Sequence, residues 1–298
     1  MNNDGATDTG RVGVGIDCGN GHFHLARVRQ DAGWPQVQAL ARFESSHIKE
    51  HCLLTGGRLA FSVGDHLVMT REVAVTDPGN FDGRLLAGFD SMQSVLDDRD
   101  EFRFDCVPLG TGGRYQASTV RRSVLEQLTR PLENGFPDIS GGVDYVLRSA
   151  ALGRGYIMFC RPAPEAFVCL ADLHDRAISI CFVYQGLIVG LTHLMTDRFD
   201  LDGDTGLERM VVEFRTLVNF KLASLSENGI SIPLTSLVLS GEKAGDRVRS
   251  VLQKYFSARV EVPHIGNSFF PDPAATSGVP LERYLVALGL AAGEKPHR

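Results

Sequence analysis

Two aspartates, each at the end of an apolar run, could take part in phosphate chemistry. Asp17 follows the run Val12–Ile16 and opens the turn Cys18–Gly21, and Asp172 closes the run Phe167–Ala171. Glycines let backbone N–H groups approach phosphate oxygens, while a carboxylate can hold a magnesium ion through its waters. The first turn therefore predicts a phosphate and magnesium site. A hairpin that uses its glycines only to turn would have the same pattern.

The two aspartates belong to a pattern that recurs at about half the chain length. In both places an apolar strand is followed by a short turn, two further strands and then amphipathic helices. Strands that alternate with helices indicate an α/β layered fold. The recurrence predicts two related halves, with Asp17 and Asp172 facing each other across a cleft.

The order of these motifs resembles the actin-like nucleotide-binding family, and within it the PilM-like assembly proteins of type IV pili. Val14–Gly21 resembles the first phosphate loop of that family, Leu170–Asp172 the second, and Leu237–Gly241 the adenosine loop. Tyr284–Leu290 is similar to its closing helix. The resemblance implies an α/β fold of two duplicated ribonuclease H-like halves that flank a central cleft, with a small inserted subdomain in the first half.

The resemblance also implies a division of the chain. Residues 1–10 would be a disordered tail, and residues 11–160 the first half, including the inserted subdomain at about 77–140. Residues 161–298 would be the second half, whose last helix, at about 281–292, packs back on the molecule.

The cofactor-binding residues implied by the resemblance lie in the three loops. They are Asp17, Gly19, Asn20, Gly21, Asp172, His174, Ser240 and Gly241. ATP and magnesium are the implied cofactors, with Asp17 as the metal ligand.

Two of these loops depart from the family's pattern. His174 stands where the second loop has glycine, and Glu242-Lys243 stands where the adenosine loop has a second glycine. A histidine places a Cβ and an imidazole where backbone should approach a phosphate, although the imidazole could instead donate a hydrogen bond to it. Hydrolysis requires both phosphate loops and a positioned water. We therefore expect weak or lost nucleotide binding, and we assign no catalytic residue.

A second candidate site lies at His47–His51, which matches the pattern H-x-x-E-H. In such a motif two histidines, here His47 and His51, hold zinc and the glutamate, here Glu50, acts as a base. The flanking Ser45-Ser46 and Thr55–Gly57 leave room for only about two helical turns, which favours a solvated loop. A metal-dependent hydrolase is therefore the least favoured hypothesis.

Composition limits the partners and the location. The net charge is −6 and no cluster of lysine and arginine is longer than two, which argues against a nucleic-acid partner. Residues 1–10 lack the pattern of a secretory signal, and the apolar stretch Ala177–Leu191 is interrupted by Gln185-Gly186. A spanning helix needs about 20 apolar residues, so we interpret this stretch as a hairpin of two strands. We expect a cytoplasmic protein that reaches the inner membrane only through a partner.

The resemblance implies a scaffold or assembly component of a type IV pilus or a related secretion machine, akin to the MshI and GspL components. In that family the cytoplasmic tail of the PilN-like inner-membrane protein docks between subdomains, by strand addition or groove contacts. The alternative is an active ATPase or sugar-type kinase of the same superfamily. That hypothesis needs an acidic base near the first loop, and the sequence offers no convincing one.

Overall fold

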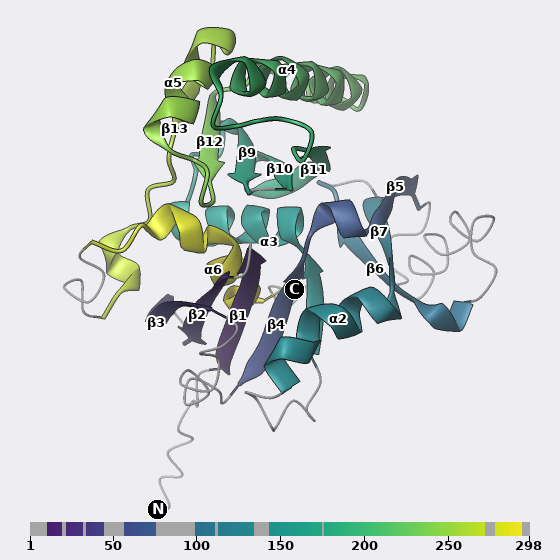
Figure 1. Ribbon diagram of the computed structural model, residues 1–298, viewed down its shortest axis with the longest axis vertical. Coiled ribbons are helices and arrows are strands. Elements are labelled where there is room, and N and C mark those ends of the chain that lie inside the picture. The colour runs from purple at the N-terminus through teal and green to yellow at the C-terminus, as the bar shows by residue number, and fades with distance from the viewer. Residues whose placement is uncertain are drawn as a thin grey trace, which may run out of the picture.

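The computed structural model describes residues 11–19, 22–31, 34–44, 57–75, 99–110, 113–133, 143–174, 176–271 and 278–293. Their strands form two large sheets and one small sheet (Figure 1). The first large sheet has the order β3-β2-β1-β4-β8 and the second the order β11-β10-β9-β12-β13. The small sheet has the order β5-β7-β6.

The strands of the first large sheet are β1 (Arg11–Gly19), β2 (His22–Gln30), β3 (Pro35–Glu44), β4 (Arg58–Val63) and β8 (Val143–Leu147). Those of the second are β9 (Phe167–Leu173), β10 (Ala177–Tyr184), β11 (Leu187–Met195), β12 (Ser236–Ser240) and β13 (Arg259–Glu261). In each sheet three consecutive antiparallel strands are followed by two that run parallel to the first. The two large sheets therefore share one topology, as the recurring sequence pattern predicts.

The small sheet and the helices complete the fold. The small sheet consists of β5 (Met69–Ala74), β6 (Phe102–Pro108) and β7 (Arg114–Arg121). The α-helices are α2 (Arg122–Glu133), α3 (Arg148–Gly155), α4 (Asp204–Glu227), α5 (Asp246–Tyr255) and α6 (Leu285–Ala292). Shorter turns are η2 (Asp65–Leu67), η4 (Arg99–Glu101), η6 (Tyr156–Cys160), η7 (Asn267–Phe269) and η9 (Leu281–Tyr284). The predicted boundary between the halves, after residue 160, stays a prediction.

Helices α3 and α6 lie between the two large sheets, while α4 and α5 cover the outer face of the second sheet (Figure 1). Burial on both faces explains why β9 is apolar at nearly every position instead of alternating. Glycine allows the inner layers to approach closely. A Cβ on Gly15 of β1 would lie 2.1 Å from the carbonyl oxygen of Ala287, and one on Gly289 would lie 1.9 Å from that of Ala151. The glycines thus let α6 pack against both β1 and α3.

The apolar stretch predicted to be a hairpin is one. β10 and β11 pair as antiparallel strands, and Gln185 and Gly186 both adopt positive φ angles at the turn. This is the backbone of a type I′ turn, which matches the twist of the strands it joins. Within the part of the chain that the structure describes, no helix combines the length and apolar character that crossing a membrane would require.

Candidate functional site

Asp17 and Asp172 occupy equivalent places near the ends of β1 and β9, the central strands of the two large sheets. Each has a serine on the neighbouring parallel strand. The hydroxyl of Ser62 on β4 donates to Asp17 Oδ1 over 2.6 Å, and Ser240 on β12 lies opposite Asp172 in register. The two aspartates and their serines therefore repeat one local arrangement.

Arg148 joins the two aspartates. It is the first residue of α3 and directly follows β8 of the first large sheet. Its Nη2 donates to Asp17 Oδ2 over 2.6 Å, its Nε to Asp172 Oδ2 over 2.7 Å, and its Nη1 to the carbonyl oxygen of Cys18 over 2.9 Å. The side chain of Arg148 is 6% exposed and each carboxylate is 2% exposed. One buried guanidinium therefore links the central strands of both large sheets.

The charges in this cluster are strongly coupled. Burial alone would lower the pKa of Arg148, but the carboxylates of Asp17 and Asp172 outweigh it and raise that pKa above its usual range. Burial raises the pKa of Asp17 to about 6, opposed by Arg148 and reinforced by the charge of Asp172. The pKa of Asp172 is lowered, because Arg148 stabilises the carboxylate by its charge and its hydrogen bond against the effect of burial. Asp172 is thus the firmly ionised partner of the guanidinium.

The loop after β12 closes over Asp172. Gly241 has a φ of +93°, and a Cβ there would lie 2.5 Å from the carbonyl oxygen of Leu173 and 2.9 Å from Asp172 Oδ1. The next residue, Glu242, reaches the first large sheet. Its Oε1 accepts from Arg42 Nη2 over 2.9 Å and lies 3.8 Å from His24 Nε2. Glu242, one of the departures from the family's pattern, thus makes a second ionic contact between the large sheets.

His174 lies just beyond the end of β9 and is buried. Its ring centroid is 6.0 Å from that of His66 in η2. Burial and the nearby charge of Arg148 lower the pKa of His174 to about 3, so the imidazole is neutral. Among the described residues its Nε2 has no hydrogen-bond partner. His174 thus places a neutral ring beside the aspartate cluster.

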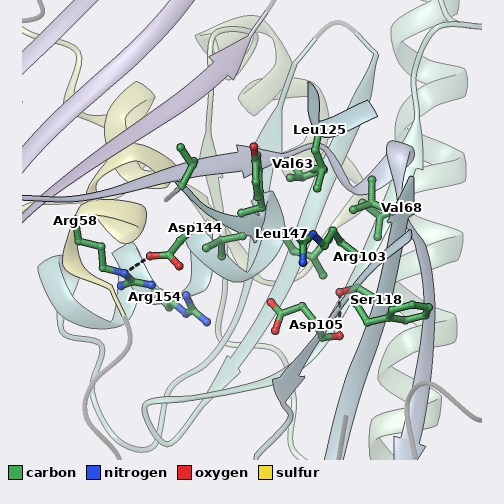
Figure 2. A pocket seen from close by; sticks show the side chains of 15 residues that line it. Arg58, Val63, Val68, Arg103, Asp105, Ser118, Leu125, Asp144, Leu147 and Arg154 are labelled. Atoms are coloured by element: carbon green, nitrogen blue, oxygen red, sulfur yellow. Dashed lines mark hydrogen bonds and ion pairs between the residues drawn. The ribbon is translucent and has the colours of Figure 1, made fainter. Parts of the chain in front are cut away.

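A separate pocket of about 460 Å³ lies between the first large sheet and the small sheet (Figure 2). β8 and β6, which are the edge strands of these two sheets in the described part of the chain, both contribute residues to its lining. Its apolar surface includes Val63, Val68, Leu125 and Leu147. Charged side chains surround this surface: Arg58, Arg103, Asp105, Asp144 and Arg154, with an ion pair between Arg58 and Asp144.

No family model matches the chain, and no curated protein sequence matches it. Among solved structures, a PilM–PilN type IV pilus biogenesis complex matches with a TM-score of 0.66 and 15% identity, over 94% of this chain and 97% of that one. A Bacteroides thetaiotaomicron protein with an actin-like ATPase fold and unknown function matches with a TM-score of 0.53 and 11% identity, over 99% and 100%. The chain has the actin-like fold. The cytoplasmic domain of EpsL, an inner-membrane component of the Vibrio cholerae type II secretion system, matches with a TM-score of 0.46 and 9% identity, over 95% of both chains.

The actin-like fold confirms the α/β class that the motifs predict. It brings Asp17, Asp172, His174, Ser240 and Gly241 together at facing strand ends. Gly19 is close by, since a Cβ on it would lie 3.8 Å from Arg148 Nη2.

Other predicted site residues lie outside the described residues. These are Asn20 and Gly21 of the first loop and the proposed zinc-site residues His47, Glu50 and His51. Within the described ranges, no three histidine, cysteine, aspartate or glutamate side chains gather in a way that could hold a metal ion.

The described residues do not fit a magnesium nucleotide at the predicted position. Both oxygens of Asp17 are engaged, one by the hydroxyl of Ser62 and the other by Arg148. The guanidinium itself lies between the two carboxylates that would have to face the phosphates and the metal. A cation at this place is therefore already supplied by the chain.

Arg148 is the site residue that the sequence analysis missed. It is separated from Asp17 by more than a hundred positions, so no local motif joins them. One signal was available. The start of a helix favours acidic over basic side chains, and an arginine directly between a buried strand and a small-residue helix therefore implies a carboxylate nearby in space.

Proposed function

We propose that this protein is a cytoplasmic actin-like scaffold of a type IV pilus or a related secretion machine, which binds the cytoplasmic tail of a PilN-like inner-membrane protein. The fold shared with a pilus biogenesis complex supports this proposal. The observation that carries it is the pocket between β8 and β6, because it is an open volume with both apolar and charged side chains along its walls. The protein would reach the membrane only through this partner.

The chemistry of the pocket suits a short peptide. An extended peptide can dock in such a groove through its apolar side chains, while a few charged groups set its orientation. Alternate side chains of such a peptide would point toward Val68 and Leu125, since side chains alternate along a strand. Three arginines and two aspartates line the pocket, so an acidic group on the peptide would complement it.

The cleft argues against the alternative of an active ATPase or kinase. Such an enzyme must bring phosphate oxygens between the two aspartate-bearing strand ends, and Arg148 takes up that position. Phosphate approach would require the guanidinium to leave both carboxylates in a buried site. We therefore propose that nucleotide binding is weak or lost, and that the protein acts by assembly rather than turnover.

A titration with a defined peptide tests partner binding. The probe is a fluorescent peptide with the cytoplasmic tail sequence of the membrane protein encoded immediately downstream. We expect saturable binding, and Phe104→Asp, which places a charge at the half-buried pocket wall, should weaken it at least about tenfold.

Phe220→Asp is the matched control, because Phe220 is 74% exposed on α4 and does not line the pocket. It should leave the affinity unchanged, and both variants should keep the parent's melting temperature within a few degrees. Equal weakening by both variants, or no binding by the parent, would argue against a partner site in this pocket.

A further inference from the structure

The contacts of Arg148 connect the two large sheets rather than stabilising one of them. Its backbone belongs to the segment that leaves β8, and Cys18 and Asp17 lie on β1 of the same sheet. Asp172, however, lies on β9 of the second sheet. Any rotation that opened the cleft between the sheets would have to break one of these bonds.

The position of Arg148 is unfavourable for a cation in local terms. A positive side chain in the first turn of a helix faces the positive end of the helix dipole. Here the side chain is also almost completely removed from water, which costs several kcal/mol unless the charge is paired. Only the two carboxylates, one from each sheet, make this location stable.

We propose that Arg148 takes the place of a divalent cation in this actin-like fold and holds the cleft closed without a ligand. A divalent cation between facing aspartates is bound by carboxylate oxygens. The planar guanidinium likewise neutralises both carboxylates: it donates one hydrogen bond to each of them and a third to the backbone carbonyl of Cys18. The closed arrangement is then encoded in the chain and independent of nucleotide supply.

A second contact between the same sheets supports this assignment. Arg42 on β3 pairs with Glu242 at 2.9 Å, and their side chains are 42% and 21% exposed. This pair lies nearer the solvent than the Arg148 cluster and again joins the first sheet to the loop after β12. The inference goes beyond the proposed function, since it applies whether or not a partner peptide binds.

The test is to remove the guanidinium and offer a metal in its place. Arg148→Ala leaves Asp17 and Asp172 facing each other, and we expect a melting temperature about 5–10 °C below that of the parent. Magnesium or manganese chloride at about ten times its Kd should restore a few degrees of this loss in the variant. The parent should show no such response.

Two further variants make the result specific. Adding Asp172→Asn to Arg148→Ala removes one of the facing carboxylates, and the rescue by metal should disappear. Arg148→Lys keeps the charge but lacks the fork that serves two carboxylates, so it should fall between the parent and the alanine variant. If the alanine variant does not fold, the neutral variant Arg148→Gln keeps the test decisive, because metal should then raise its melting temperature while leaving that of the parent unchanged.

Three outcomes would overturn the proposal. One is a loss of stability in Arg148→Ala that no divalent cation repairs, because Arg148 would then be an ordinary structural ion pair. Another is an alanine variant as stable as the parent. The third is binding of magnesium ATP to the parent with micromolar affinity in isothermal titration calorimetry. None of these measurements involves the partner peptide, so failure here is distinct from failure of the proposed partner binding.

Discussion

The cleft between the large sheets and the pocket beside the small sheet differ in the space that they leave for a ligand. In the cleft, Asp17 and Asp172 pair with Arg148, and Glu242 pairs with Arg42, all within the chain. In the pocket, two strand edges and several charged side chains line an open volume. A region whose polar groups are already paired within the chain gains little from a ligand, whereas an open volume lined by apolar and charged side chains leaves room for one. The ionic contacts of the cleft thus join the two large sheets, and we propose the pocket as the place where a ligand binds.

Within the cleft, the two equivalent aspartates also differ from each other in their pKa values. Asp17 and Asp172 occupy equivalent strand positions, yet the pKa of Asp17 is raised to about 6 and that of Asp172 is lowered. Each accepts a hydrogen bond from Arg148 with one oxygen, so the guanidinium alone does not explain the difference. Asp17 also carries the unfavourable effects of the charges of Asp172 and Glu242, which raise its pKa further. Asp172 is therefore firmly ionised in the folded state, whereas ionisation of Asp17 is less favourable there than in the unfolded chain.

Replacing each aspartate separately should give the largest effect and expose this asymmetry. Asp172→Asn removes the firmly ionised partner of a buried guanidinium and should cost roughly 3–5 kcal/mol of unfolding free energy. Asp17→Asn should cost only about 1 kcal/mol, because the amide oxygen can still accept from Arg148 while the amide NH2 group donates to the hydroxyl of Ser62. Urea denaturation at pH 7 measures both.

The pH dependence provides a check on the smaller of these two effects. Because the folded-state pKa of Asp17 lies above the unfolded value of 3.8, the folded state binds the extra proton between 3.8 and about 6. The contribution of Asp17 to stability therefore falls as the pH rises through that window. The parent should lose stability relative to Asp17→Asn from pH 4 to pH 6. Equal losses of unfolding free energy in Asp17→Asn and Asp172→Asn at pH 7 would contradict the difference proposed between the two aspartates.

Sequence patterns predict much of the fold because they are local. The alternating strands around Asp17 and the apolar run before Asp172 specify the central elements, and Gln185-Gly186 specifies a hairpin turn. Their recurrence predicts the shared topology and the facing aspartates. The sequence also shows glycines in β1, such as Gly15, but the reason that glycine is needed there is the close contact with α6, which only the structure shows.

The parts of the site that were not predicted depend on contacts between distant segments. Arg148 meets Asp17 and Asp172 only when β8, β1 and β9 are assembled, and no spacing along the chain records this. Glu242 was noticed as a departure from a glycine pattern, but its pairing with Arg42 depends on how the two sheets face each other. In the sequence Glu242 replaces an expected glycine, whereas in the structure it makes an ionic contact between the two large sheets.

An intermediate effect should come from His174, the other departure in the cleft. Its folded-state pKa of about 3 lies below the unfolded value of 6.5, so the unfolded state takes up a proton first as the pH falls. The contribution of His174 to stability is therefore present above pH 6.5 and is lost progressively toward pH 3. His174→Gln should remove up to about 1.4 kcal/mol per pH unit from the acid slope of the unfolding free energy.

The control for this measurement is His264→Gln, which changes an exposed histidine of the same chain. It should leave the acid slope between pH 6 and pH 4 as it is in the parent. His24 remains in both variants, and burial lowers its pKa to about 4, so some acid sensitivity should persist. An unchanged slope in His174→Gln would mean that the imidazole is not held neutral beside the aspartate cluster.

The smallest effect should come from the outer ionic contact of the cleft. Glu242→Gln removes the carboxylate that pairs with Arg42, and since both side chains are partly exposed, the loss should be below about 1 kcal/mol. Salt screens such a pair, so the difference from the parent should shrink in 0.5 M sodium chloride, whereas the cost of Asp172→Asn should persist. Glu261→Gln offers a matched control, because Glu261 pairs with Arg259 within a single strand and joins no two sheets.

Hydrogen exchange at the strand ends beside the cleft distinguishes the effects of the two glutamates. Removing Glu242 should speed exchange there if the contact helps to hold the sheets together, while removing Glu261 should not. Identical exchange in both variants would leave cohesion of the cleft to the buried arginine alone.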